Sequence, residues 1–142
     1  MRTNRVNLAL SLGLLILAGL ACNYSASTAN ISDLKLGKDK EVSQATTTFA
    51  GNDTVYAVAT VSNAPGKVHV KGRLVIEDVE GEQAGPIPGL EKTLDLDGSG
   101  TATFTFTPPP TGWPKGKYKV EVFLLDDGGQ QKDQKSVSFS AS

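Results

Sequence analysis

Hydrophobic and polar side chains alternate along most of the sequence that follows Ile31. The segment 67–77 shows this most clearly, with apolar residues at every second position along one side: Val68, Val70, Leu74 and Ile76. The opposite side carries His69, Lys71, Arg73 and Glu77. A period of two is typical of a β-strand with one buried face, and no window has the period of an amphipathic helix. We therefore predict that this part of the chain is built of strands.

Further segments with the same alternation, or with a run of β-branched and aromatic residues, are also predicted to be strands. They contain Leu34 and Leu36, residues 54–62, Leu94 and Leu96, residues 102–106, residues 118–124, and Val137 with Phe139. Residues 97–100 predict a hairpin turn, and residues 126–129 predict another turn. About seven strands in roughly 110 residues predict an all-β fold, in which two antiparallel sheets pack face to face as a β-sandwich.

The stretch 113–122 has the sequence Trp-Pro-Lys-Gly-Lys-Tyr-Lys-Val-Glu-Val. It resembles the segment that leads into the sixth strand of fibronectin type III and immunoglobulin-like (Ig-like) domains, where a Pro-Gly turn precedes a tyrosine. The resemblance is carried by Trp113, Pro114, Gly116 and Tyr118. It implies a tyrosine corner, in which the tyrosine hydroxyl bonds back to the loop, and a single Ig-like domain over residues 31–142. Such a fold implies no function by itself.

Two features near this stretch allow more than one role. Trp113 either plugs one end of the core or presents a platform on which a sugar ring stacks. The proline triplet 108–110 either stiffens a crossing from one sheet to the other or forms a polyproline ligand for a partner. The plug and the stiff crossing are the preferred interpretations.

The first 21 residues have the pattern of an export signal. Arg2 and Arg5 precede an uncharged segment, 8–20, which is shorter than the roughly 20 apolar residues that a membrane-spanning helix needs. The sequence Ala-Gly-Leu-Ala before Cys22 resembles the lipobox of bacterial lipoproteins, which implies cleavage before Cys22 and lipidation of this residue. The small residues before the cysteine also fit ordinary signal peptidase, which would release the protein without a lipid.

Residues 22–30 are predicted to be the lipidated cysteine and a short flexible tether, because the segment after Cys22 is polar and uncharged. Cys22 is the only cysteine, so the fold has no internal disulfide and must rest on its apolar core. We therefore expect an exported protein that is lipid-anchored to the cell membrane or outer membrane. Its domain would face the periplasm or the cell exterior.

Composition and residue types argue against several functions. Without residues 1–21 the chain keeps 12 of its 14 basic side chains and all 15 acidic ones, and this negative balance argues against nucleic acid as a partner. His69, the only histidine, lies on a polar strand face rather than beside a nucleophile and a buried acid. One cysteine and one histidine cannot supply the ligands of a zinc site. We therefore predict no catalytic residue, no metal and no cofactor, and no enzyme.

Residues 95–100 match only part of a calcium-binding loop. Asp95, Asp97 and Ser99, followed by Gly100, match the opening of an EF-hand loop. Phe106 occupies the position where that loop needs a bidentate glutamate, and strands flank the segment. A plain hairpin turn is the preferred interpretation.

One surface is a candidate for binding. In an Ig-like sandwich the third and sixth strands are neighbours, so the alternation would place five basic residues on one outer face: His69, Lys71, Arg73, Lys117 and Lys119. Such a face could attract anionic glycans, phospholipid headgroups or an acidic partner. The alternative is that Glu77 and Glu121 form cross-strand pairs with these residues and leave an ordinary solvated face.

These observations favour a membrane-anchored Ig-like module that binds another envelope protein, a glycan or another envelope component. The first alternative is a structural or assembly subunit whose sheet edges pair with another chain. The second is an accessory carbohydrate-binding module, which would need exposed aromatic rings near Trp113. The three hypotheses differ in what they require at the surface, namely a binding site, an open edge or an aromatic strip.

Overall fold

The computed structural model of the protein describes residues 29–142. The predicted leader 1–21, Cys22 and most of the tether 22–30 lie outside the described residues. The described part contains eight strands: β1 (Asn30–Gly37), β2 (Thr48–Phe49), β3 (Val55–Ser62), β4 (Val68–Val79), β5 (Gly85–Leu96), β6 (Gly100–Phe106), β7 (Gly116–Asp126) and β8 (Gln131–Ala141). Within residues 29–142 no helix is long and apolar enough to cross a membrane.

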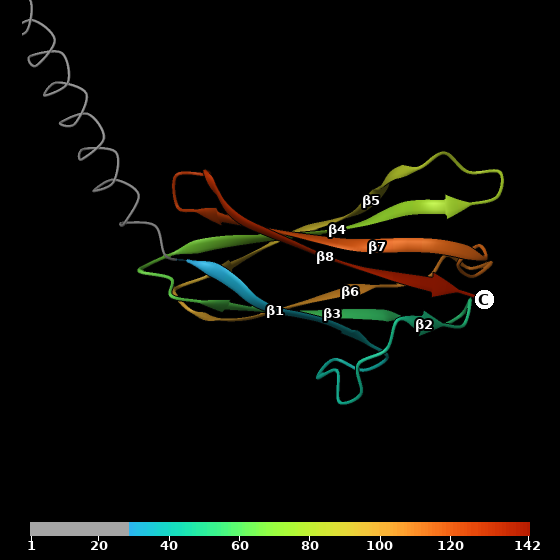
Figure 1. Cartoon of the computed structure of the whole chain (residues 1–142), viewed down its shortest axis with the longest axis horizontal. Helices are drawn as coiled ribbons and strands as arrows, with labels where there is room; N and C mark the ends of the chain where they lie inside the picture. Colours follow the sequence, from blue (N-terminus) through green and yellow to red (C-terminus); the bar gives the residue numbers. More distant parts are fainter. Residues whose placement is uncertain (1–28) are drawn as a thin grey trace, which may run out of the picture.

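The strands form two sheets that face each other (Figure 1). One sheet has the order β1-β3-β6, and the other has the order β2-β8-β7-β4-β5. The prediction of an all-β, two-sheet sandwich is therefore confirmed. The expected neighbours also meet, because β4 and β7 pair antiparallel along their length, from Val68 opposite Asp126 to Val79 opposite Gly116.

The alternation in the sequence places the core between the sheets. On β6 the residues Ala102, Phe104 and Phe106 are buried, while the threonines between them are exposed. On β4 the inner position opposite Phe104 is Gly72, where an added Cβ would lie 2.7–2.9 Å from three atoms of the Phe104 ring. Gly72 therefore makes room for an aromatic ring of the facing sheet, which is why a glycine interrupts the apolar series of this strand.

One predicted turn is wrong, and two features add detail to the predicted sandwich. Residues 97–100 do not close a hairpin, because β5 and β6 belong to different sheets and the turn carries the chain from one sheet to the other. The eight strands agree with the expected number of about seven, and the shortest, β2, consists of Thr48 and Phe49. This strand pairs parallel with β8, so the second sheet is not wholly antiparallel. The proline triplet 108–110 does lie in a crossing between sheets, from β6 to β7.

The two ends of the sandwich differ in the segments that they hold. We call the end where β1 begins the proximal pole; there Asn30 lies opposite Ser62, and the backbone N–H of Ile31 donates to Asp133. We call the other end the distal pole; it holds the end of β4 at Val79, the start of β7 and the C-terminus (Figure 1). The predicted tether therefore joins the sandwich at the proximal pole. The distal pole lies roughly 35 Å away, along the 12 residues of β4.

Candidate functional site

The five predicted basic residues occupy the outer side of the neighbouring strands β4 and β7. His69, Lys71 and Arg73 alternate with the buried residues of β4, and Lys117 and Lys119 do the same on β7. Four of these five side chains are partly buried, and Lys117 is exposed. Shared placement on one sheet face does not decide whether the face is positive, because neighbouring carboxylates contribute as well.

Carboxylates from β5 and from the turn after β7 approach the first two residues of this face. His69 Nδ1 lies 2.6 Å from Asp95 Oδ1, and His69 Nε2 lies 3.5 Å from Asp127 Oδ1. The hydrogen bond with Asp95 raises the pKa of His69 above its ordinary value, because the carboxylate favours the imidazolium. Lys71 Nζ lies 3.3 Å from Glu91 Oε1. The positive charges at this end of the face are thus matched by carboxylates.

The middle of the face is held by Glu121. Its Oε1 accepts a 2.8 Å hydrogen bond from Arg73 Nε, and its Oε2 lies 3.5 Å from Lys119 Nζ. The guanidinium of Arg73 also lies over the ring of Phe123, with 5.0 Å between Cζ and the ring centroid. Glu121 is 8% exposed, so it is a buried charge compensated by two cations. The outer face is therefore a network of ion pairs that leaves little net charge to attract an anion.

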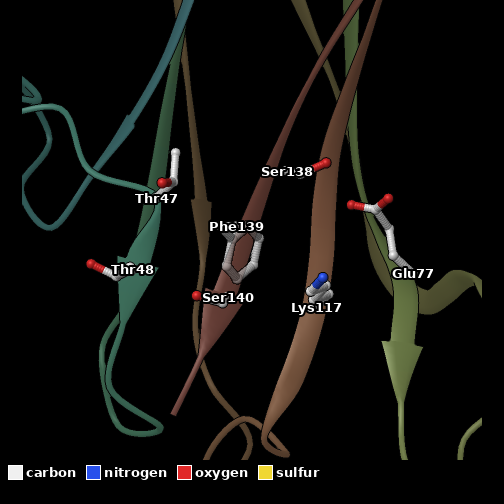
Figure 2. Close-up of a pocket in the computed structure, with 7 residues that line it drawn as sticks. All are labelled: Thr47, Thr48, Glu77, Lys117, Ser138, Phe139 and Ser140. Carbon is white, nitrogen blue, oxygen red and sulfur yellow. The ribbon is translucent and has the colours of Figure 1, made fainter.

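Lys117 stands apart from this network. No carboxylate of residues 29–142 lies within ion-pair distance of its Nζ, and the residue lines a shallow polar groove at the distal pole (Figure 2). The groove has a volume of about 360 Å³ and is lined by Lys117 and by Thr47, Thr48, Glu77, Ser138, Phe139 and Ser140. Its hydroxyl groups, one lysine and one glutamate can donate and accept hydrogen bonds without a strong net charge.

The residues of the predicted tyrosine corner lie together at the same pole. The hydroxyl of Tyr118 donates a hydrogen bond to the carbonyl of Pro114, 2.5 Å away. The indole N–H of Trp113 donates to the carbonyl of Asp53, 2.8 Å away, and the Trp113 ring packs edge-on against Tyr118. Gly116 has a positive φ and starts β7, where an added Cβ would collide with the backbone of Asp78. Trp113 is 6% exposed, which fits a plug at the end of the core rather than a flat sugar platform on the surface.

A cavity opens between the two sheets beside this corner, and we call it the distal cavity. Its volume is about 370 Å³, and it is lined by Ile76, Glu82, Ile87, Pro88, Leu90, Thr107, Pro109, Trp113, Pro114 and Tyr118. Residues 87–90 of β5 have no partner in the register with β4, so this part of the edge strand leaves the sheet and forms one wall. Most of the lining is apolar, and the volume falls in the range of small-molecule sites, roughly 300–1,000 Å³.

The wall formed by β5 is what sequence reasoning missed. The segment 85–90 alternates glycine and proline with isoleucine and leucine, and its strand character is masked by these breakers. The signal that could have revealed this wall is the pair of apolar residues Ile87 and Leu90, because a segment of glycine and proline that were only a surface loop would have no reason to contain them. For metals, residues 29–142 contain no group of His, Cys, Asp and Glu side chains that could hold an ion.

Comparison with known proteins identifies the fold and no family. No protein-family model matches the sequence, and no curated protein matches it. Among solved structures, the chain is similar to Bacteroides uniformis β-glucuronidase 2, covalently bound to cyclophellitol-6-carboxylate aziridine, with a TM-score of 0.52 and 16% identity over 79% of this chain and 14% of that chain. It is also similar to a cycloisomaltooligosaccharide glucanotransferase from Paenibacillus sp., with a TM-score of 0.52 and 15% identity over 81% of this chain and 14% of that chain.

A third similar structure is OgpA from Akkermansia muciniphila, with a TM-score of 0.51 and 12% identity over 80% of this chain and 28% of that chain. The chain thus spans less than a third of each of these three proteins. At such low identity the likeness shows a shared β-sandwich fold and carries no activity across.

Proposed function

We propose that this chain is an exported lipoprotein, anchored in a membrane through a lipid on Cys22, whose Ig-like sandwich is a binding module for a component of the cell envelope. The observation that carries the binding role is the position of two hollows in the described part, residues 29–142. The distal cavity and the polar groove both lie at the pole opposite to Asn30, where the tether joins the sandwich. A module tethered in this way presents its hollows away from its anchor.

The anchor is supported by the sequence before the sandwich. A basic start, a short apolar segment and small residues before the only cysteine are the features of a lipoprotein leader. We expect the Cys22→Ser variant to lose metabolic labelling with palmitate and to leave the membrane fraction. Globomycin should make the unprocessed precursor of the original chain accumulate. Unchanged processing and membrane attachment of Cys22→Ser would refute the lipid anchor.

The binding role is tested by cross-linking in intact cells. A photoreactive amino acid at position 117 lies in the polar groove, whereas the same residue at position 67 is exposed near the proximal pole, just before β4. We expect a discrete cross-linked species from position 117, and its yield should fall when purified sandwich is added as a competitor. We expect no such species from position 67. Equal cross-linking from both positions would contradict a binding pole.

The assembly alternative has less support from the sheet edges. On β1 the backbone N–H of Ile31 donates to Asp133 Oδ2, and the backbone carbonyl of Ile31 accepts from Lys135 Nζ. Two backbone groups at this sheet edge are therefore already hydrogen-bonded to side chains of β8. On the other sheet, the edge strand β5 carries Pro86 and Pro88, which have no N–H to donate. Capped edge groups and prolines are features that prevent an edge from pairing with another chain.

A further inference from the structure

The distal cavity has one charged side chain in its lining, Glu82. The other polar groups of the lining residues are the hydroxyls of Thr107 and Tyr118 and the indole N–H of Trp113. The Tyr118 hydroxyl already donates to Pro114, and the Trp113 N–H already donates to Asp53. No basic residue of the described part, 29–142, lies within ion-pair distance of Glu82. Glu82 is exposed, so its carboxylate lies on the solvent side of the hollow. An apolar hollow with one carboxylate at its solvent side favours a ligand with an apolar body and a cationic head.

The charge of Glu82 acts on the interior of the cavity. Burial is the main cause that raises the pKa of Tyr118, and the negative charge of Glu82 adds to it, because both disfavour a phenolate. The same field disfavours an anionic ligand in the cavity and favours a cation. The chain therefore has a basis for distinguishing ligands of equal size by the sign of their charge.

We propose that the distal cavity binds a small amphipathic amine, with its apolar body between β5 and the 107–114 loop and its ammonium group beside Glu82. This inference deepens the proposed binding role and rests on it. The size of the cavity suits one small molecule. Its place between the sheets, away from the ion-paired outer face, gives the ligand an apolar environment that the surface does not offer.

The chain contains its own reporter for this binding. Trp113 is the only tryptophan and lines the cavity, so a ligand there changes its fluorescence emission. The full chain would be titrated with decylamine, decanol and decanoate, which share one apolar length and differ in charge, at physiological ionic strength. We expect decylamine to bind roughly two- to fivefold more tightly than decanol, and decanoate to bind most weakly, because Glu82 is exposed and one exposed contact between opposite charges has about this effect.

Three variants locate the effect. Glu82→Gln should remove most of the preference for decylamine over decanoate, whereas Glu80→Gln, on the same connection between β4 and β5 but outside the lining, should keep it. Ile87→Phe should weaken all three probes, because the larger side chain fills the cavity. A far-ultraviolet spectrum of each variant checks that the sandwich is intact.

The outcomes separate this inference from the proposed function. Decanoate binding as tightly as decylamine, or a preference that survives Glu82→Gln, would overturn the amine while leaving the cavity as a binding site. If no probe changes the emission of Trp113, or if Ile87→Phe changes no affinity, the cavity is not a ligand site. The proposed function would then rest on the polar groove alone, which the cross-linking at position 117 tests separately.

Discussion

The ion pairs on the outer face of β4 and β7 can be measured as coupling energies. Arg73 and Glu121 share a 2.8 Å hydrogen bond between side chains that are 29% and 11% exposed. A hydrogen bond to a charged group contributes about 1.5–3 kcal/mol, and the partial exposure of Arg73 reduces this to about 1–2 kcal/mol. Lys71 and Glu91 form a matched pair on the same face, but they are 33% and 47% exposed, and such pairs contribute about 0.2–1 kcal/mol.

Two double-mutant cycles test this difference. One replaces Arg73 and Glu121 by methionine, singly and together, and the other does the same with Lys71 and Glu91. The free energy of unfolding in urea gives each coupling energy, and methionine keeps the aliphatic packing while it removes the charge. We expect a coupling of about 1.5 kcal/mol for the first pair and of about 0.2–1 kcal/mol for the second.

A small coupling in the first cycle would have a functional consequence. If the coupling between Arg73 and Glu121 is no larger than that of the exposed pair, Glu121 does not hold the guanidinium. Arg73 and Lys119 would then be free to attract an anionic partner, and the face predicted from the sequence would regain its role as a binding surface. Binding of the original chain to heparin at physiological salt would support that contrary result.

Three further predictions concern the sandwich itself. Gly72→Ala should lower the free energy of unfolding by about 1–3 kcal/mol in urea, because its Cβ would meet the Phe104 ring, whereas Gly66→Ala, with open space around it, should have no such effect; equal stabilities would show that the two sheets are not packed at Gly72. Tyr118→Phe should cost about 1 kcal/mol through the lost hydrogen bond to Pro114, and an unchanged urea midpoint would contradict this role. The pKa of His69 is raised and that of Asp95 is lowered, so their ion pair should stabilise the fold fully between the ordinary pKa of Asp, 3.8, and the ordinary pKa of His, 6.5. This contribution should be lost as the pH rises through the raised, folded-state pKa of His69. The difference in melting temperature between the original chain and His69→Gln should therefore shrink above pH 6.5, and a difference that grows with pH would refute the assignment.

The strands were predictable where one face is buried and the other is wet. On β6 each threonine alternates with a core residue, and on β7 the series Tyr118, Val120, Val122 and Leu124 is buried as the alternation implies. The turn at 97–100 was misassigned because its chemistry is local. Asp, Gly and Ser favour a tight reversal, but they do not determine whether the next strand pairs with the previous one or crosses to the other sheet.

The candidate site was harder to predict, because it depends on contacts distant in sequence. Alternation correctly placed Lys71 and Arg73 on one outer face, but the carboxylates that compensate them include Glu91 of β5, whose position depends on the pairing of β5 with β4. The distal cavity requires Ile87 and Leu90 to leave the sheet and face Trp113 across the gap. The alternation of apolar and polar residues shows which side chains face inward, but it does not show where the two sheets move apart and leave a cavity.

The proposed ligand binds between the sheets at the distal pole rather than on the charged outer face. The most direct measurement is photoaffinity labelling of the full chain with an alkylamine that carries a diazirine, followed by mass spectrometry of the labelled residues. We expect labels on residues 76–90 and 107–118, with protection by excess decylamine. Labels concentrated on Lys71, Arg73 and Lys119, or spread evenly along the sandwich, would contradict the account.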